Sequence, residues 1–156
     1  MQTIAAYLAS IFNVCLQKKA EIVYDIKFLK VQVLSIVTKP GEKRYMSCER
    51  RYGADCKYLR FSNNADYEML ECTCQVNNLK FDVISRGYLM VVDLQGIIST
   101  DESGRKTLEL TDPAIHCKDL TRFSRTNWGL EGMKTFFGRH VCNKFCHAME
   151  LEPTVL

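Results

Sequence analysis

Apolar residues over positions 1–14 recur every three or four places, which is the spacing of an amphipathic helix. The segment has no basic leader and no clear signal cleavage site, so we interpret it as a helix rather than an export signal. Its apolar stripe consists of Ile4, Tyr7, Leu8, Ile11 and Phe12.

β-Prone residues dominate positions 26–37, and the polar turn residues at 39–42 separate them from a short strand over 44–49. Another short strand is predicted over 57–61. A helical or irregular segment is predicted over 66–74.

The run over 88–92 is wholly apolar and ends at Asp93, which is typical of a strand buried on both faces. A polar loop is predicted over 99–106, and residues 109–121 are expected to be irregular because Pro113 breaks any helix. A last helix is expected from about Leu130. Strands thus precede the final helix, which predicts an α+β fold.

Three soft metal ligands, His140, Cys142 and Cys146, lie within seven residues near the end of the chain. The two cysteines are four apart and would share a helix face, whereas His140 would point nearly the other way on a continuous helix. All three can meet one Zn²⁺ only if a helix ends or kinks near His140. Two buried thiols and a surface histidine are the alternative. The apolar positions that predict this helical segment are Met133, Phe136, Phe137, Val141, Phe145 and Met149.

Composition narrows the class of protein. The net charge of +3 comes from scattered basic residues with acidic ones among them, which gives no reason to expect nucleic-acid binding. No apolar run approaches the roughly 18–20 residues that span a membrane. The eight cysteines, in a chain without an export signal, are expected to be reduced thiols, some of them bound to metal, in a cytoplasmic protein.

Four short motifs occur in order along the second half of the chain, and together they resemble the α-kinases, a family of atypical serine/threonine protein kinases. The stretch 48–52 resembles that family's hinge, and residues 58–64 resemble another of its motifs. The four motifs are Val91-Val92-Asp93-Leu94-Gln95-Gly96, Thr111-Asp112-Pro113-Ala114-Ile115-His116, Ser124 to Gly129, and His140 to Cys146.

The resemblance implies ATP and Mg²⁺ as cofactors, because phosphoryl transfer depends on neutralising phosphate charge. Asp93 and Gln95 would hold Mg²⁺ and phosphate oxygens, and both would point to one side of an extended chain. Asp112 matches a second catalytic aspartate, and Glu49 matches a hinge acid near the adenine. Without the resemblance, Asp93 is a strand-end turn residue, Asp112 a cap and Glu49 an exposed charge.

The resemblance also implies a loop that serves the peptide substrate, represented here by Asn127 and Gly129. Two glycines of that loop are replaced by Ser124 and Thr126, which we expect to stiffen it.

The family's zinc site has four ligands, of which His140, Cys142 and Cys146 match three. For the fourth we expect Cys74, with Cys72 as the second choice.

We therefore expect a zinc-stabilised, protein-kinase-like C-terminal lobe over 51–156, preceded over 1–50 by the end of the N-terminal lobe and the hinge. No lysine here matches the one that reaches the ATP phosphates, so we expect that lysine to lie before the first helix. The function implied is an ATP-dependent serine/threonine kinase acting on a protein, with no nucleic-acid or membrane partner. The alternative is a catalytically dead pseudokinase or truncated fragment that binds a protein.

Overall fold

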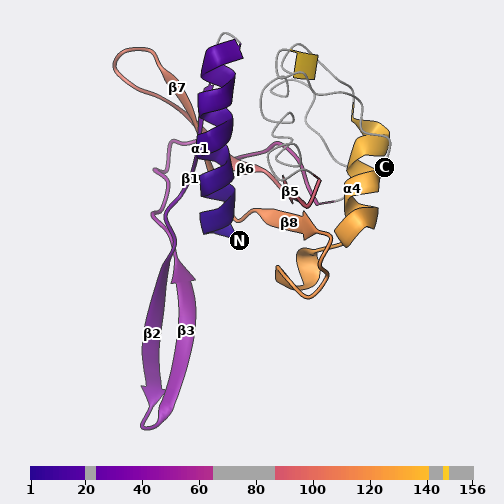
Figure 1. The fold of residues 1–156 in the computed structure, drawn as a ribbon. Helices are drawn as coiled ribbons and strands as arrows, with labels where there is room; N and C mark the ends of the chain where they lie inside the picture. The colour runs from indigo at the N-terminus through magenta and orange to yellow at the C-terminus, as the bar shows by residue number, and fades with distance from the viewer. Residues whose placement is uncertain (20–23, 65–86, 141–145, 148–156) are drawn as a thin grey trace.

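The computed structural model describes residues 1–19, 24–64, 87–140 and 146–147, and the elements named below all lie within these ranges (Figure 1). It combines helices with strands, which confirms the mixed class that was predicted. In the described part of the chain, no helix is both long and apolar enough to cross a membrane.

Helix α1 covers Gln2–Lys19 and extends beyond the predicted segment. Its buried face is made by Ala5, Leu8, Ala9, Phe12 and Leu16. The predicted stripe is therefore wrong for Tyr7, which is 64% exposed. Small alanines rather than the tyrosine face the sheet, which allows the helix to approach the strands closely.

Four strands form the central sheet, in the order β1-β7-β6-β4. Strand β1 runs parallel to β7, while β6 is antiparallel to both β7 and β4. The main core lies between this sheet and α1, and residues on both sides of position 50 contribute to it. The strands are β1 (Tyr24–Phe28), β4 (Leu59–Arg60), β6 (Gln95–Thr100) and β7 (Lys106–Thr111).

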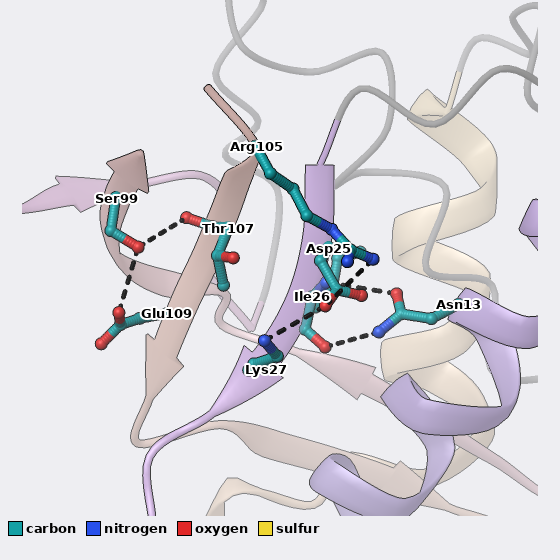
Figure 2. A network of polar contacts seen from close by, with 8 residues as sticks. All are labelled: Asn13, Asp25, Ile26, Lys27, Ser99, Arg105, Thr107 and Glu109. Atoms are coloured by element: carbon teal, nitrogen blue, oxygen red, sulfur yellow. Dashed lines mark hydrogen bonds and ion pairs between the residues drawn. The ribbon is translucent and has the colours of Figure 1, made fainter. Parts of the chain in front are cut away.

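The outer edge of β1 is secured by a helix side chain. Asn13 of α1 donates to the carbonyl of Ile26 at 2.8 Å and accepts from its N–H at 3.2 Å (Figure 2). Asp25 lies 3.2 Å from the Lys27 amine and 4.0 Å from Arg105 beyond β7. The two hydrogen bonds of the Asn13 side chain take the place of a neighbouring strand and satisfy the backbone groups of Ile26, which would otherwise be unpaired.

A long hairpin extends away from the rest of the molecule (Figure 1). It consists of β2 (Gln32–Lys39) and β3 (Glu42–Cys48), and every residue in it is exposed. The prediction of one strand over 26–37 is wrong, because the chain leaves the sheet at Leu29, whose N–H binds the carbonyl of Leu110.

Strands β5 (Leu89–Val92) and β8 (Ala114–Cys117) form a separate antiparallel pair. β5 is buried as predicted except at Leu89, which is half-buried, and Tyr88, which precedes the strand and is exposed. The expectation of irregular structure over 109–121 is wrong for 109–111 and 114–117, which are strands, whereas 118–121 are irregular. Pro113 lies between β7 and β8, where it interrupts neither ladder. The 3₁₀ turn η1 (Ser124–Thr126) and helix α4 (Gly129–Arg139) follow, and Met133 of α4 packs on this pair.

Candidate active site

Two short connections between strands, called crossings below, bring the predicted catalytic residues together. The chain leaves β5 for β6 through Asp93, and it leaves β7 for β8 through Asp112. Val92 pairs with Ala114 on one side of these crossings, and Gln95 pairs with Thr111 on the other. The two aspartates therefore lie at the same end of both ladders, although 18 residues separate them in the sequence.

Both aspartates have left-handed backbone conformations, with φ of 56° at Asp93 and 45° at Asp112. Residues other than glycine seldom adopt this conformation, and such strain is concentrated at functional sites. The extended conformation assumed for Asp93 in the sequence analysis is therefore wrong. The left-handed turns redirect both crossings so that the two carboxylates share one region.

Arg60 of β4 binds Asp93 directly. Its Nε and Nη2 donate to Oδ1 of Asp93 at 3.1 and 2.8 Å. Burial raises the pKa of the Asp93 carboxyl, the Arg60 charge lowers it, and the neighbouring Asp112 charge raises it, with a net upward shift. A cation at this position thus offsets part of the cost of holding two carboxylates close together.

Gln95 is directed toward the second aspartate. Its Nε2 donates to the Asp112 carbonyl at 3.5 Å, which leaves the amide oxygen as its acceptor end. A carboxylate and an amide oxygen are hard ligands that suit Mg²⁺. The chemistry of the Asp93 and Gln95 side chains therefore fits this ion, and Oδ1 of Asp93 also accepts from Arg60.

Glu49, the predicted hinge acid, is held at both of its carboxylate oxygens. Oε1 accepts from Gln2 Nε2 at 2.6 Å, and Oε2 accepts from the hydroxyl of Thr111. Gln2 also accepts from the N–H of Asp112 at 3.2 Å. Glu49 thus connects the start of α1 to the crossing that carries Asp112.

Asn127 organises the predicted substrate loop from inside. Its amide oxygen accepts from the N–H groups of Cys117 and Gly129, each at 2.8 Å. Its Nδ2 donates to the carbonyls of Asp119 and Arg122. The side chain is buried, and its hydrogen bonds connect the end of β8, the residues after it and the start of α4, so it determines the shape of the loop.

At Ser124 the loop has a left-handed backbone conformation that is typical of glycine. Ser124 has φ of 62°, although this is one of the two positions at which serine or threonine replaces the expected glycine. Gly129 retains φ of 58°. The substitution at Ser124 therefore preserves a left-handed conformation, at a conformational cost.

His116 of β8 is fully buried, and its ring packs against Gly132 of α4. Its Nδ1 accepts from the N–H of Trp128 at 3.1 Å, and its Nε2 lies 2.9 Å from the carbonyl of Asn64. Burial lowers the pKa of the imidazole, and the Asn64 carbonyl partly offsets this shift. A neutral ring with Nδ1 as acceptor and Nε2 as donor satisfies both contacts.

Gly132→Ala is expected to destabilise the protein by about 1–3 kcal/mol, because the new methyl group would lie 2.5 Å from Nε2 of the His116 ring. Gly138→Ala, on the same helix but with nothing within 4 Å of the new Cβ, is expected to stabilise it by about 0.5–1 kcal/mol. Urea unfolding of the two variants measures both effects. Equal effects would contradict the close packing of His116 on α4.

Helix α4 ends at Arg139, and His140 adopts an extended backbone conformation with ψ of 126°. This is the break that a shared metal site requires, and it allows His140 Nε2 to lie 3.3 Å from the sulfur of Cys146. Imidazole and thiolate ligands on one tetrahedral Zn²⁺ lie about 3.6 Å apart. The pair therefore fits zinc.

Two of the four predicted zinc ligands, Cys74 and Cys142, lie outside the described residues, as does Cys72. Within the described ranges, no three His, Cys, Asp or Glu side chains gather around a common point that could hold a metal ion. Of the four predicted ligands, only His140 and Cys146 lie among the described residues.

Three residues of this site had no role predicted from the sequence: Arg60, Gln2 and Thr111. Arg60 stands next to an aromatic-rich stretch and reads as an ordinary surface cation, while Gln2 reads as a polar helix start. Only the register of β6 on β7 places Thr111 beside them. The single available signal was the position of Thr111, directly before Asp112.

The chain is similar to known proteins in both sequence and fold. The sequence matches the family model described as the Alpha-kinase family over residues 1–146. Alpha-protein kinase 1 of Dictyostelium discoideum is 31% identical over 153 residues, which are 97% of this chain and 10% of that protein. Eukaryotic elongation factor 2 kinase of Homo sapiens is 26% identical over 133 residues, or 83% of this chain and 17% of that protein.

The alpha-kinase domain of myosin heavy chain kinase A in complex with ADP has a similar fold, with a TM-score of 0.80 at 23% identity. The match covers 99% of this chain and 57% of that one. The chain therefore spans about half of this solved domain and a smaller part of the curated relatives.

Proposed function

Because the chain belongs to the α-kinase family, we propose that it supplies the catalytic residues for transfer of the ATP γ-phosphate to a serine or threonine hydroxyl of a protein. The observation that carries this proposal is the convergence of Asp93, Gln95 and Asp112 at two adjacent left-handed crossings. A purely structural module has no need of two strained carboxylates beside each other.

Each of these residues would have a separate role in phosphoryl transfer. Asp93 and Gln95 would hold Mg²⁺, which when bound neutralises charge on the phosphates. Asp112 is more exposed than Asp93, and its carboxylate would orient the acceptor hydroxyl and take its proton. Arg60, which binds Asp93, would add a positive charge near the bound phosphates.

The loop shaped by Asn127 and Gly129 would present the protein substrate. It follows β8 after residues 118–123, and the Thr126 hydroxyl lies 3.8 Å from the sulfur of Met1, next to the Gln2 that binds Asp112. Met1 contacts the loop, and the adjacent Gln2, the first residue of α1, contacts the catalytic crossing, which supports a substrate path between them.

We also propose that His140, Cys142, Cys146 and Cys74 bind one structural Zn²⁺. The break in α4 and the contact between His140 and Cys146 support this proposal. Cys15, Cys48, Cys56 and Cys117 form no disulfide, which suits the proposed cytoplasmic location.

Binding of ATP in the presence of Mg²⁺ tests the proposed function. We expect saturable binding that Asp93→Ala abolishes, because this change removes a metal ligand and leaves Arg60 without its partner. Asp55→Ala, which alters an exposed aspartate elsewhere, is the matched control and should leave binding unchanged. Isothermal titration calorimetry measures the affinity.

If folded wild-type protein shows no binding at millimolar ATP, the kinase function is wrong. That outcome would favour the alternative of a pseudokinase module that binds a protein. Loss of phosphate transfer in Asp112→Asn, with ATP binding retained, would assign the proton-accepting role to Asp112.

A further inference from the structure

Glu49 is held too firmly at both oxygens to act as a free ligand-binding acid. One oxygen accepts from Gln2 and the other from Thr111, a residue that is only 8% exposed. The Gln2 amide is itself fixed, since its Nε2 also donates to the carbonyl of Leu29 at 2.7 Å. A carboxylate that accepts hydrogen bonds from two separate elements, one at each oxygen, keeps one orientation.

Both partners of Glu49 act on the same neighbour, Asp112. Thr111 precedes it in the chain, and Gln2 Oε1 accepts from its N–H at 3.2 Å. The Asp112 backbone is therefore held from the side of β7 and from the side of α1. Its own carbonyl accepts from Gln95, which connects the arrangement to the predicted Mg²⁺ ligand.

We infer that Glu49, Thr111 and Gln2 are positioning residues, which keep Asp112 in its strained left-handed conformation for phosphate transfer. This inference rests on the proposed kinase function. It differs from the role that the family resemblance implies for Glu49, in which this acid serves the adenine base.

The physical reason is the cost of the Asp112 conformation. A left-handed aspartate at an exposed crossing relaxes toward ordinary backbone angles unless its surroundings prevent this. The hydrogen bond to Gln2 fixes the N–H on one side of the residue, and the Thr111 hydroxyl fixes the peptide unit before it. Small displacements of a catalytic group reduce the rate steeply, with little effect on binding of a distant base.

Thr111→Val tests this inference in the full chain, with Thr111→Ser as the conservative rescue. Valine keeps the shape of threonine but has no hydroxyl for Glu49, whereas serine keeps the hydroxyl. We expect Thr111→Val and Glu49→Ala to lower kcat roughly ten- to hundredfold while KM for ATP changes less than about twofold. Thr111→Ser should retain most of the wild-type kcat.

Hydrogen exchange at the Asp112 amide gives a measurement that does not depend on activity. Glu49→Ala removes one of the two acceptors of Gln2 Nε2 and leaves only the Leu29 carbonyl, so exchange at Asp112 should become roughly tenfold faster. The matched control is Arg50→Gln, which removes the adjacent 2.7 Å ion pair to Glu109 and touches neither Gln2 nor Thr111. It should leave the exchange rate unchanged.

The role in adenine binding predicts the opposite pattern. If Glu49→Ala weakens ATP binding tenfold, leaves GTP binding unchanged and does not alter Asp112 exchange, our inference is wrong. If the wild type transfers no phosphate but Glu49→Ala still accelerates exchange at Asp112, the contact is confirmed and only the proposed function fails. Unchanged exchange together with unchanged kcat would contradict positioning directly.

Discussion

Gly96→Ala is expected to destabilise the protein by about 3–5 kcal/mol, which is enough to unfold a marginal domain. The backbone of Gly96 has φ of 156°, and β6 approaches β7 so closely there that a methyl group would collide with the carbonyl of Glu109. The new Cβ would also lie 2.9 Å from Leu110 Cα. These are backbone atoms of a paired strand, so neither can move aside without breaking the ladder.

Gly104→Ala is the matched control, since Gly104 lies in the turn between the same two strands. It has a positive φ of 82° but nothing within 4 Å of a new Cβ. This variant should lose only the conformational term, about 1–2 kcal/mol. Urea unfolding of both variants separates collision from backbone strain. If Gly96→Ala unfolds no more easily than Gly104→Ala, the close approach of β6 to β7 is wrong.

Cys146→Ser and His140→Ala are each expected to remove zinc from the purified protein and to cost several kcal/mol of stability or abolish folding. Ligand binding energy enters folding directly, because an unfolded chain holds no preformed site. The buried sulfur of Cys146 beside His140 Nε2 offers the arrangement from which this loss follows. Elemental analysis of zinc per chain, paired with thermal unfolding, measures both effects.

Cys56→Ser is the control, since its sulfur is exposed and remote in sequence from the proposed ligands. It should retain about one zinc per chain. Protein that folds without zinc and tolerates a strong chelator would contradict the whole site. Zinc that survives Cys74→Ser but not Cys146→Ser would contradict only the choice of the fourth ligand.

The local parts of the fold were predictable because local patterns determine them. The apolar run over 88–92 gave β5 and its burial, and the apolar spacing gave α1 and α4. Asp93, Gln95 and Asp112 could also be predicted as catalytic residues, because the motifs that contain them resemble those of the family and occur in the same order. The structure brings these three residues together.

The parts that failed depend on contacts between distant segments. The break between β1 and β2 arises where Leu29 binds the backbone of Leu110. Strand β8 forms because β5 lies opposite it, although Pro113 precedes it. The role of Glu49 depends on Gln2, 47 positions earlier. Sequence spacing contains none of this information.

The parallel pairing of β1 with β7 has a consequence for the order of folding. Tyr24 of β1 lies opposite Lys106 of β7, so β1 cannot pair until β7, which is synthesised much later, is present. During synthesis, α1 and the β2–β3 hairpin leave the ribosome well before the surface that α1 covers exists. Such non-local pairing slows folding, so we expect nascent chains of this protein to depend on chaperones until β7 has emerged.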